Sequence, residues 1–173
     1  MKKFRNFALV PLVAALAACA TGYGSGPTAE AKLVPTQGNT ASGSVSFRQD
    51  GANVVVDARV SGLTPGAHGF HIHDKGDCSA ADGTSAGGHF NPSAKPHGHP
   101  EHAEHHAGDL PQLIADAAGN AALTATLSGL TIGSGAANIV GRGLIVHAAP
   151  DDFKTQPTGN SGARVACGVI AAR

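Results

Sequence analysis

Charge, long apolar runs and helical periodicity are all scarce in this chain of 173 residues. Charged residues make up 14% of it and the formal net charge is zero, which leaves no basic face for nucleic acid. The longest mostly apolar run, residues 7–18, is too short to span a bilayer as a helix. No segment shows convincing helical periodicity, and no repeat of 20–50 residues occurs. These absences argue against a nucleic-acid-binding protein, a transmembrane helix and a helical repeat.

The N-terminal residues have the pattern of an export signal. A basic start at Met1–Arg5 precedes the apolar run, and this order is typical of a secretory signal. The run ends in Leu16-Ala17-Ala18-Cys19, which resembles a bacterial lipobox. It predicts a signal peptide over residues 1–18, a lipidated Cys19 and a periplasmic or cell-envelope protein anchored to the membrane. Ordinary signal cleavage nearby, with Cys19 incidental, is the alternative.

Residues 19–40 contain several glycines and prolines and lack apolar periodicity. We interpret them as a flexible tether that would hold a folded domain clear of the membrane. The folded domain is then predicted over residues 41–173.

Cysteine is also scarce, and the number of cysteines is informative. Once Cys19 is set aside, Cys78 and Cys167 remain, and an even pair in an exported protein is expected to form a disulfide. The enclosed loop of about 90 residues would contribute roughly 4–5 kcal/mol of stability in chain-entropy models. Two buried free thiols are the alternative, and neither cysteine has the spacing of a zinc knuckle.

Alternation of apolar and polar residues is the dominant local pattern. Each alternating segment suits a strand with one buried face. These segments run from Val45 to Phe47, from Val54 to Val60, from Leu123 to Leu127 and from Val165 to Val169. Many short strands between turn residues predict an all-β antiparallel sandwich or barrel. Two long loops, about residues 74–110 and 148–163, are expected to be functional because structureless loops of that length usually are.

Seven residues form a candidate metal-binding set. They are His71, His73, His89, His97, His106, Asp109 and His147. Imidazole suits copper and zinc, whereas oxygen-preferring ions would demand more carboxylates. His71 and His73 are two apart on a predicted strand and therefore point the same way, while His68 faces the other side. We exclude His68 from the site and interpret it as a hydrogen-bonded structural histidine.

The seven residues divide into two sets. Predicted strands supply three imidazoles, from His71, His73 and His147. Three nitrogens and one oxygen suit a closed tetrahedral zinc site, and the first long loop supplies them from His89, His97, His106 and Asp109. His105 competes with His106 as a ligand, and the spacing of the motif favours His106.

The motifs around these residues resemble those of the copper/zinc superoxide dismutase family. The matching stretches are Gly69-Phe70-His71-Ile72-His73, Gly87-Gly88-His89-Phe90-Asn91-Pro92, His106-Ala107-Gly108-Asp109-Leu110, Gly141 to His147 and Gly159 to Gly168. They occur in the family's order and extend over about residues 41–173. The resemblance implies a Greek-key antiparallel β-sandwich or flattened barrel of about eight strands with two long functional loops.

The same resemblance assigns the metals, one copper and one zinc per subunit. The implied copper ligands are His71, His73, His89 and His147. The implied zinc ligands are His89, His97, His106 and Asp109, so that His89 is shared. The implied activity is disproportionation of superoxide to dioxygen and hydrogen peroxide by alternate reduction and reoxidation of copper, which would protect the cell envelope. On reduction the bridge would open on the copper side, and His89 would take up a proton that it later delivers.

The resemblance implies roles for Arg164 and Asp151, and charge alone suggests roles for Lys75 and Lys154. Arg164 is expected beside the copper, where it would attract superoxide, and an ordinary surface arginine is the alternative. Asp151 would hydrogen-bond one copper and one zinc histidine and so orient both, although Asp152 competes for this assignment. Lys75 and Lys154 would steer superoxide by their positive charge, or they are plain solvated lysines.

Three histidines are surplus to the family's set, namely His99, His102 and His105. Either they capture additional metal, or they belong to a solvated loop that tolerates histidine, which is the simpler interpretation.

Two other functions compete with the enzyme. A periplasmic copper/zinc buffer without turnover would bind both metals, but the chain retains every family copper ligand and the arginine. A purely structural zinc domain would leave His71, His73 and His147 without a purpose. The expected partners are superoxide as small-molecule substrate, the membrane through Cys19 and a second copy in a homodimer, with no nucleic acid.

Overall fold

The computed structural model describes Met1 and residues 26–173, so the predicted signal peptide, Cys19 and the first part of the tether lie outside the described residues. The described part of the chain contains nine strands and one short 3-10 helix, η1 (Thr84–Ala86). The strands are β1 (Thr28–Pro35), β2 (Ser42–Asp50), β3 (Asn53–Ser61), β4 (Gly66–His68), β5 (Phe70–His73), β6 (Leu113–Ala115), β7 (Ala121–Ser128), β8 (Gly143–His147) and β9 (Arg164–Ala172). Among these residues, none forms a helix that is both long and apolar enough to span a membrane.

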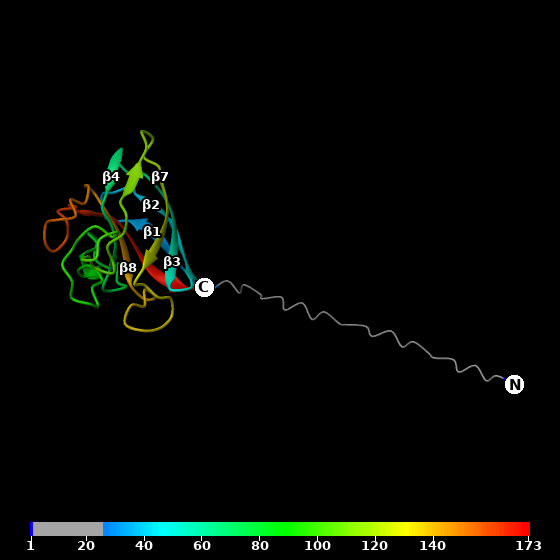
Figure 1. Ribbon diagram of the computed structural model, residues 1–173. Helices are drawn as coiled ribbons and strands as arrows, with labels where there is room; N and C mark the ends of the chain where they lie inside the picture. The colour runs from blue at the N-terminus through cyan, green and yellow to red at the C-terminus, as the bar shows by residue number, and fades with distance from the viewer. Residues whose placement is uncertain (2–25) are drawn as a thin grey trace.

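The strands form one antiparallel sheet in the order β4-β6-β7-β3-β2-β1-β9-β8-β5. Figure 1 shows these strands grouped together, with the long loops to one side. β4 and β5 stand at opposite ends of this order, yet only Gly69 separates them in the chain. The sheet must therefore curl until its two ends meet, which makes a nearly closed barrel. This confirms the predicted all-β antiparallel fold, with nine strands in the described residues rather than about eight.

The barrel interior is filled by the alternating apolar residues of the long strands. Phe47 of β2 and Val54 and Val56 of β3 are almost fully buried, while the intervening residues of β3 face outward. Burying a side chain of this size contributes about 1.5–3 kcal/mol. The alternation predicted for these two strands is confirmed.

The prediction of a flexible tether is wrong from residue 28 onward, where strand β1 begins. β1 pairs with β2 on one side and β9 on the other, and Ala29, Ala31 and Leu33 point into the core. The alternation was present in the sequence, but two of the three inward residues are alanines, whose small side chains give a weak apolar signal. The folded domain therefore begins before residue 41.

The burial predicted for β9 is confirmed at Val165 and Cys167 and is wrong at Val169. Val169 is 41% exposed, and Ala166 and Ile170 face the core instead. Cys167 is buried on the opposite side, packed against Ile145 under the first long loop. Alternation of apolar and polar residues predicts one buried face of a strand, whereas both faces of β9 are partly buried because the first long loop covers part of the outer face.

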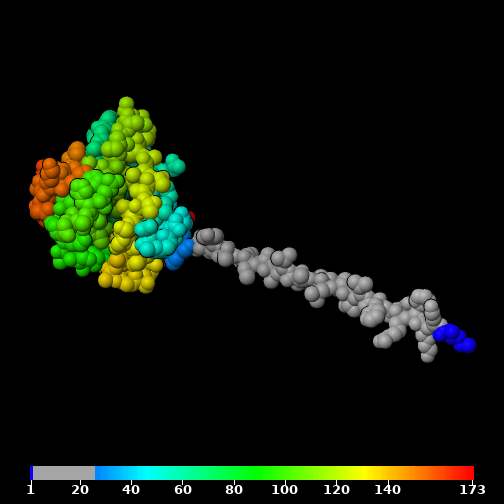
Figure 2. All heavy atoms as spheres, viewed as in Figure 1, coloured from blue at the N-terminus to red at the C-terminus, as the bar shows by residue number. Residues whose placement is uncertain are grey.

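Both predicted long loops are present, over residues 74–112 and 148–163, and a third connection joins β7 to β8 over residues 129–142. The predicted disulfide joins Cys78 to Cys167 with a Cα–Cα distance of 5.8 Å, within the usual range. It fastens the first loop to β9. The first and second long loops lie against each other (Figure 2), on the side of the barrel away from the C-terminus (Figure 1).

Candidate metal centre

The strand ligands lie on the outer face of the barrel. Phe70 and Ile72 of β5 point into the core, so His71 and His73 between and after them point outward. β8 follows the same rule, with Leu144 and Val146 inside and His147 outside. The antiparallel pairing of β5 with β8 then brings the three histidines together without any contribution from a metal.

The first long loop covers the free edge of β5. The backbone N–H of Phe90 donates to Ile72 O (2.8 Å), and the N–H of Ile72 donates to Gly108 O (2.9 Å). These contacts place His89 and Asp109 beside the strand histidines, in bridges to His73 and His71. Gly108 is required at this crossing because a Cβ atom there would overlap Ile72 O.

The seven predicted ligands come together as two buried groups that share His89. One group is His71, His73, His89 and His147, and the other is His89, His97, His106 and Asp109. Within each group one ligand atom per residue lies within 4.8 Å of all the others. His105, by contrast, stays outside both groups.

The second group has the dimensions of a tetrahedral zinc site. Asp109 Oδ1 lies 2.8 Å from His89 Nδ1 and 3.0 Å from His97 Nδ1, and His106 Nδ1 lies 3.3 Å from His89 Nδ1. Tetrahedral zinc with bonds of about 2.0–2.1 Å requires ligand atoms about 3.3 Å apart. Two imidazole nitrogens that face each other at such a distance fit a shared cation well.

The first group presents free nitrogen lone pairs. His73 Nδ1–H donates to Gly87 O (2.9 Å) and His147 Nδ1–H donates to Gly162 O (3.1 Å), which leaves Nε2 of each neutral ring as an acceptor. Within the described residues, five buried imidazole nitrogens have no hydrogen-bond partner: His71 Nδ1, His73 Nε2, His89 Nε2, His97 Nδ1 and His147 Nε2. Unpaired buried polar atoms are costly, and copper and zinc are the ions that imidazole suits.

Asp151 connects the two groups. Its carboxylate accepts hydrogen bonds from His71 Nε2 (2.7 Å) and His97 Nε2 (2.9 Å). The adjacent Asp152 is exposed and accepts a hydrogen bond from the Thr155 hydroxyl. Asp151 therefore occupies the place predicted for the carboxylate that orients both kinds of ligand.

Burial keeps the imidazoles of His73, His89 and His147 neutral, as metal ligands must be. It lowers the pKa of His89 to about 4 and that of His147 to about 3, and holds the pKa of His73 well below its usual range. His97 differs, because the effect of burial is outweighed by the nearby carboxylates of Asp109 and Asp151, which raise its pKa to about 9.

Arg164 is half-buried at the rim of the strand ligands. Its guanidinium donates to Gly83 O and Gly87 O, each at 2.6 Å, and its charge contributes to the low pKa of His73. Lys75 and Lys154 are both exposed.

Gln156 is a site residue that no sequence pattern indicates. Its side-chain Oε1 accepts the backbone N–H of His97 (2.8 Å), and its Nε2 donates to the carbonyl of the same residue (2.9 Å). The second long loop thereby clamps a ligand of the first. His68 is a buried structural histidine, as predicted, with Nδ1 2.7 Å from His147 O and Nε2 2.8 Å from Thr64 O.

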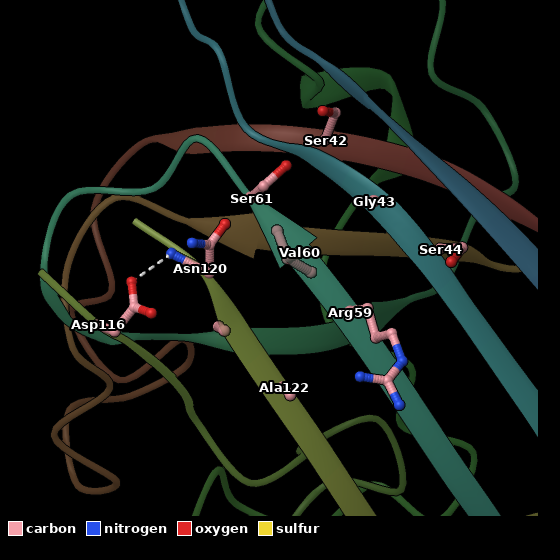
Figure 3. A pocket seen from close by; sticks show the side chains of 10 residues that line it. Ser42, Gly43, Ser44, Arg59, Val60, Ser61, Asp116, Asn120 and Ala122 are labelled. Atoms are coloured by element: carbon pink, nitrogen blue, oxygen red, sulfur yellow. Dashed lines mark hydrogen bonds between the residues drawn. The ribbon is translucent and has the colours of Figure 1, made fainter. Parts of the chain in front are cut away.

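A separate hollow of about 560 Å³ lies over β2, β3 and β7 (Figure 3). Ser44, Arg59 and Ala122 form one row across its floor, and Asp116 accepts the backbone N–H of Asn120 at its end (2.9 Å). None of its lining residues is a histidine or cysteine, so the metal chemistry belongs to the loop-covered side.

Comparisons with known proteins agree with this geometry. A family model described as copper/zinc superoxide dismutase (SODC) matches residues 41–170. The chain is 45% identical over 139 residues to "Superoxide dismutase [Cu-Zn] 2" of Mesembryanthemum crystallinum, covering 76% of this chain and 88% of that protein. It is 45% identical over 135 residues to the protein of the same name from Brassica juncea, covering 74% and 88%. Both relatives are plant proteins, so they support the family and not a bacterial origin.

Proposed function

The chain belongs to the copper/zinc superoxide dismutase family, and from this we propose how its residues disproportionate superoxide and where in the cell they do so. The enzyme binds copper and zinc and converts superoxide to dioxygen and hydrogen peroxide. Bound copper would supply the redox chemistry of this reaction.

The proposal is carried by one observation, the membership of His89 in both buried groups. Its Nδ1 faces Asp109 among the zinc ligands, and its Nε2 has no hydrogen-bond partner in the described residues. His71, His73, His89 and His147 would hold copper, and His89, His97, His106 and Asp109 would hold zinc. His89 would hold a proton at Nε2 and deliver it to the product.

Arg164 would bind the superoxide anion next to the copper ligands. Its two donated hydrogen bonds fix the guanidinium while its burial keeps the charge poorly screened. Asp151 would hold the rings of His71 and His97 in the orientation that both metals need.

The test is to load the purified protein with both metals and to measure superoxide consumption. His147→Ala should lose copper and activity, and Arg164→Ala should keep both metals while kcat/KM falls by about 10–100-fold. Arg59→Ala, in the separate hollow, is the matched control and should match the wild type. Wild-type protein that carries copper without activity would overturn the proposal in favour of a metal buffer.

We also propose export to the periplasm and attachment to the membrane through a lipid on Cys19, where the enzyme would protect the cell envelope. The basic start and the lipobox-like Leu16-Ala17-Ala18-Cys19 support this. Cys19→Ala should move the protein from the membrane fraction to the soluble fraction, and mass spectrometry should detect acyl chains on wild-type Cys19. An unmodified wild-type Cys19 would exclude the anchor.

A homodimer is the assembly that we propose. Val34 and Val169, on the outer faces of the paired strands β1 and β9, are 46% and 41% exposed and form a small apolar spot. Sedimentation velocity at micromolar concentration should give the mass of two chains, and a single-chain mass would rule the dimer out.

A further inference from the structure

The surplus histidines lie in a turn between two zinc ligands, His97 and His106. The backbone N–H of His102 donates to His99 O (2.9 Å), which closes the turn and brings the two side chains to the same side. Their ring centroids are 5.2 Å apart. Neither ring belongs to the buried groups, and His102 is exposed.

The distance between the ring centroids of His99 and His102 matches the distances within the buried zinc group. In the zinc group the ring centroids are 5.3 Å apart for His89 and His97, and 5.5 Å for His97 and His106. His99 Nδ1 accepts a long hydrogen bond from the backbone N–H of Glu101 (3.3 Å). A cation could compete with such a weak, exposed contact for the lone pair.

The ring of His105 is hydrogen-bonded through Nδ1, as the rings of His73 and His147 are. Its Nδ1 lies 2.6 Å from His106 O, and because a carbonyl can only accept, this nitrogen carries the proton. The neutral ring therefore keeps a free lone pair at Nε2, as His73 and His147 do. His102 and His105 also line the same hollow of about 730 Å³ between this turn and β7, together with Glu101.

We propose that His99 and His102 form the core of an additional, solvent-accessible site for one divalent zinc or copper ion, with His105 as a nearby imidazole. His99 and His102 supply two nitrogens from one turn, and His105 and Glu101 line the adjoining hollow beside His102. Imidazole with one carboxylate selects this class of metal over calcium or magnesium. Because the ligands are exposed and fewer than in the buried groups, the ion exchanges with solvent more readily than the resident metals do.

The test uses the full protein with both resident metals already bound. It is equilibrated by dialysis against a series of free Zn²⁺ concentrations, and total bound zinc and copper are measured by mass spectrometry. Wild type should bind one zinc beyond its resident zinc. Loss of a residue that only supports a metal ligand typically weakens metal binding by about 10–100-fold. The triple variant His99→Gln, His102→Gln, His105→Asn should weaken the binding of the additional zinc by more than this.

The substitutions are chosen to separate coordination from structure. Asn at position 105 retains a donor for His106 O but lacks the second nitrogen, so the resident metals and the melting temperature should not change. Ala103→Ser, in the same turn, is the matched control and should retain the extra zinc. A triple variant that binds the additional zinc as tightly as wild type, or a wild type that binds none, would overturn the proposal. Neither readout depends on turnover.

Discussion

The two halves of the metal centre are built in different ways. His71, His73 and His147 are held by the hydrogen-bonding register of β5 and β8. The ligands particular to the zinc half, His97, His106 and Asp109, lie on a loop where no regular strand sets their spacing. They are held by hydrogen bonds to one another, to Asp151 and to Gln156.

The difference shows what each half needs from its metal. A strand pair places its side chains whether or not an ion is bound, whereas ordering a loop costs about 1–2 kcal/mol per residue in backbone entropy. Zinc, the disulfide and the contacts with the second long loop must offset that cost. The strands that carry His71, His73 and His147 should therefore stay ordered under changes that disorder the loop of the zinc half.

The largest effect should come from Asp109→Ala. Four ligands share a zinc-binding free energy of about 10–16 kcal/mol in structural sites, so losing one should weaken zinc binding by about two to three orders of magnitude. Hydrogen exchange should accelerate over residues 89–110 while β5 and β8 stay protected. His147→Ala is the mirror control, which should lose copper but leave the loop protected. Equal loss of protection in both variants would contradict the proposed difference between the strand-held and loop-held halves of the metal centre.

Removing the disulfide should be the next largest effect. Cys78→Ser frees the first loop from β9 and should lower the free energy of unfolding by about 2–4 kcal/mol in oxidising buffer. In reducing buffer the variant and the wild type should unfold alike, since neither then has the crosslink. A variant that is destabilised equally in both buffers would mean that Cys78 acts by packing instead.

Asp151→Asn should affect both halves at once. It replaces one carboxylate oxygen by an amide that cannot accept from both His71 and His97, and residues that orient ligands contribute about 10–100-fold to metal affinity. Competition titrations should show weaker binding of copper and zinc alike. A change confined to zinc would show that the copper half does not rely on Asp151.

Gln156→Ala should give the smallest effect, and on zinc alone. It removes both hydrogen bonds to the His97 backbone, so zinc affinity should fall by about tenfold while copper affinity stays unchanged. Thr155→Ala, at the neighbouring exposed position, is the matched control. A loss of copper affinity would mean that the second long loop supports both halves.

The sequence predicted the seven metal-ligand candidates because their spacing carries information. The two-residue step from His71 to His73 fixed a common face, and the surplus His105 was set aside by its position in the motif. Strand β1 and the hydrogen bonds from Gln156 to the His97 backbone were not predicted from the sequence. Alanines provide a weak apolar signal, and a glutamine that binds a backbone amide 59 residues away leaves no local pattern. Contacts between two loops depend on tertiary structure that no single segment encodes.

Strand β9 runs from Arg164 at the metal centre to the C-terminus, where the N–H of Arg173 donates to Thr28 O at the start of β1 (Figure 1). The point at which the N-terminal segment joins the barrel is therefore roughly 25–30 Å from Arg164, the length of a nine-residue strand. Anionic lipid headgroups repel superoxide, but their potential decays over about 8 Å at physiological ionic strength. An enzyme tethered through Cys19 would hold its entrance beyond the reach of that repulsion, so attachment to a charged bilayer need not slow capture of the anion.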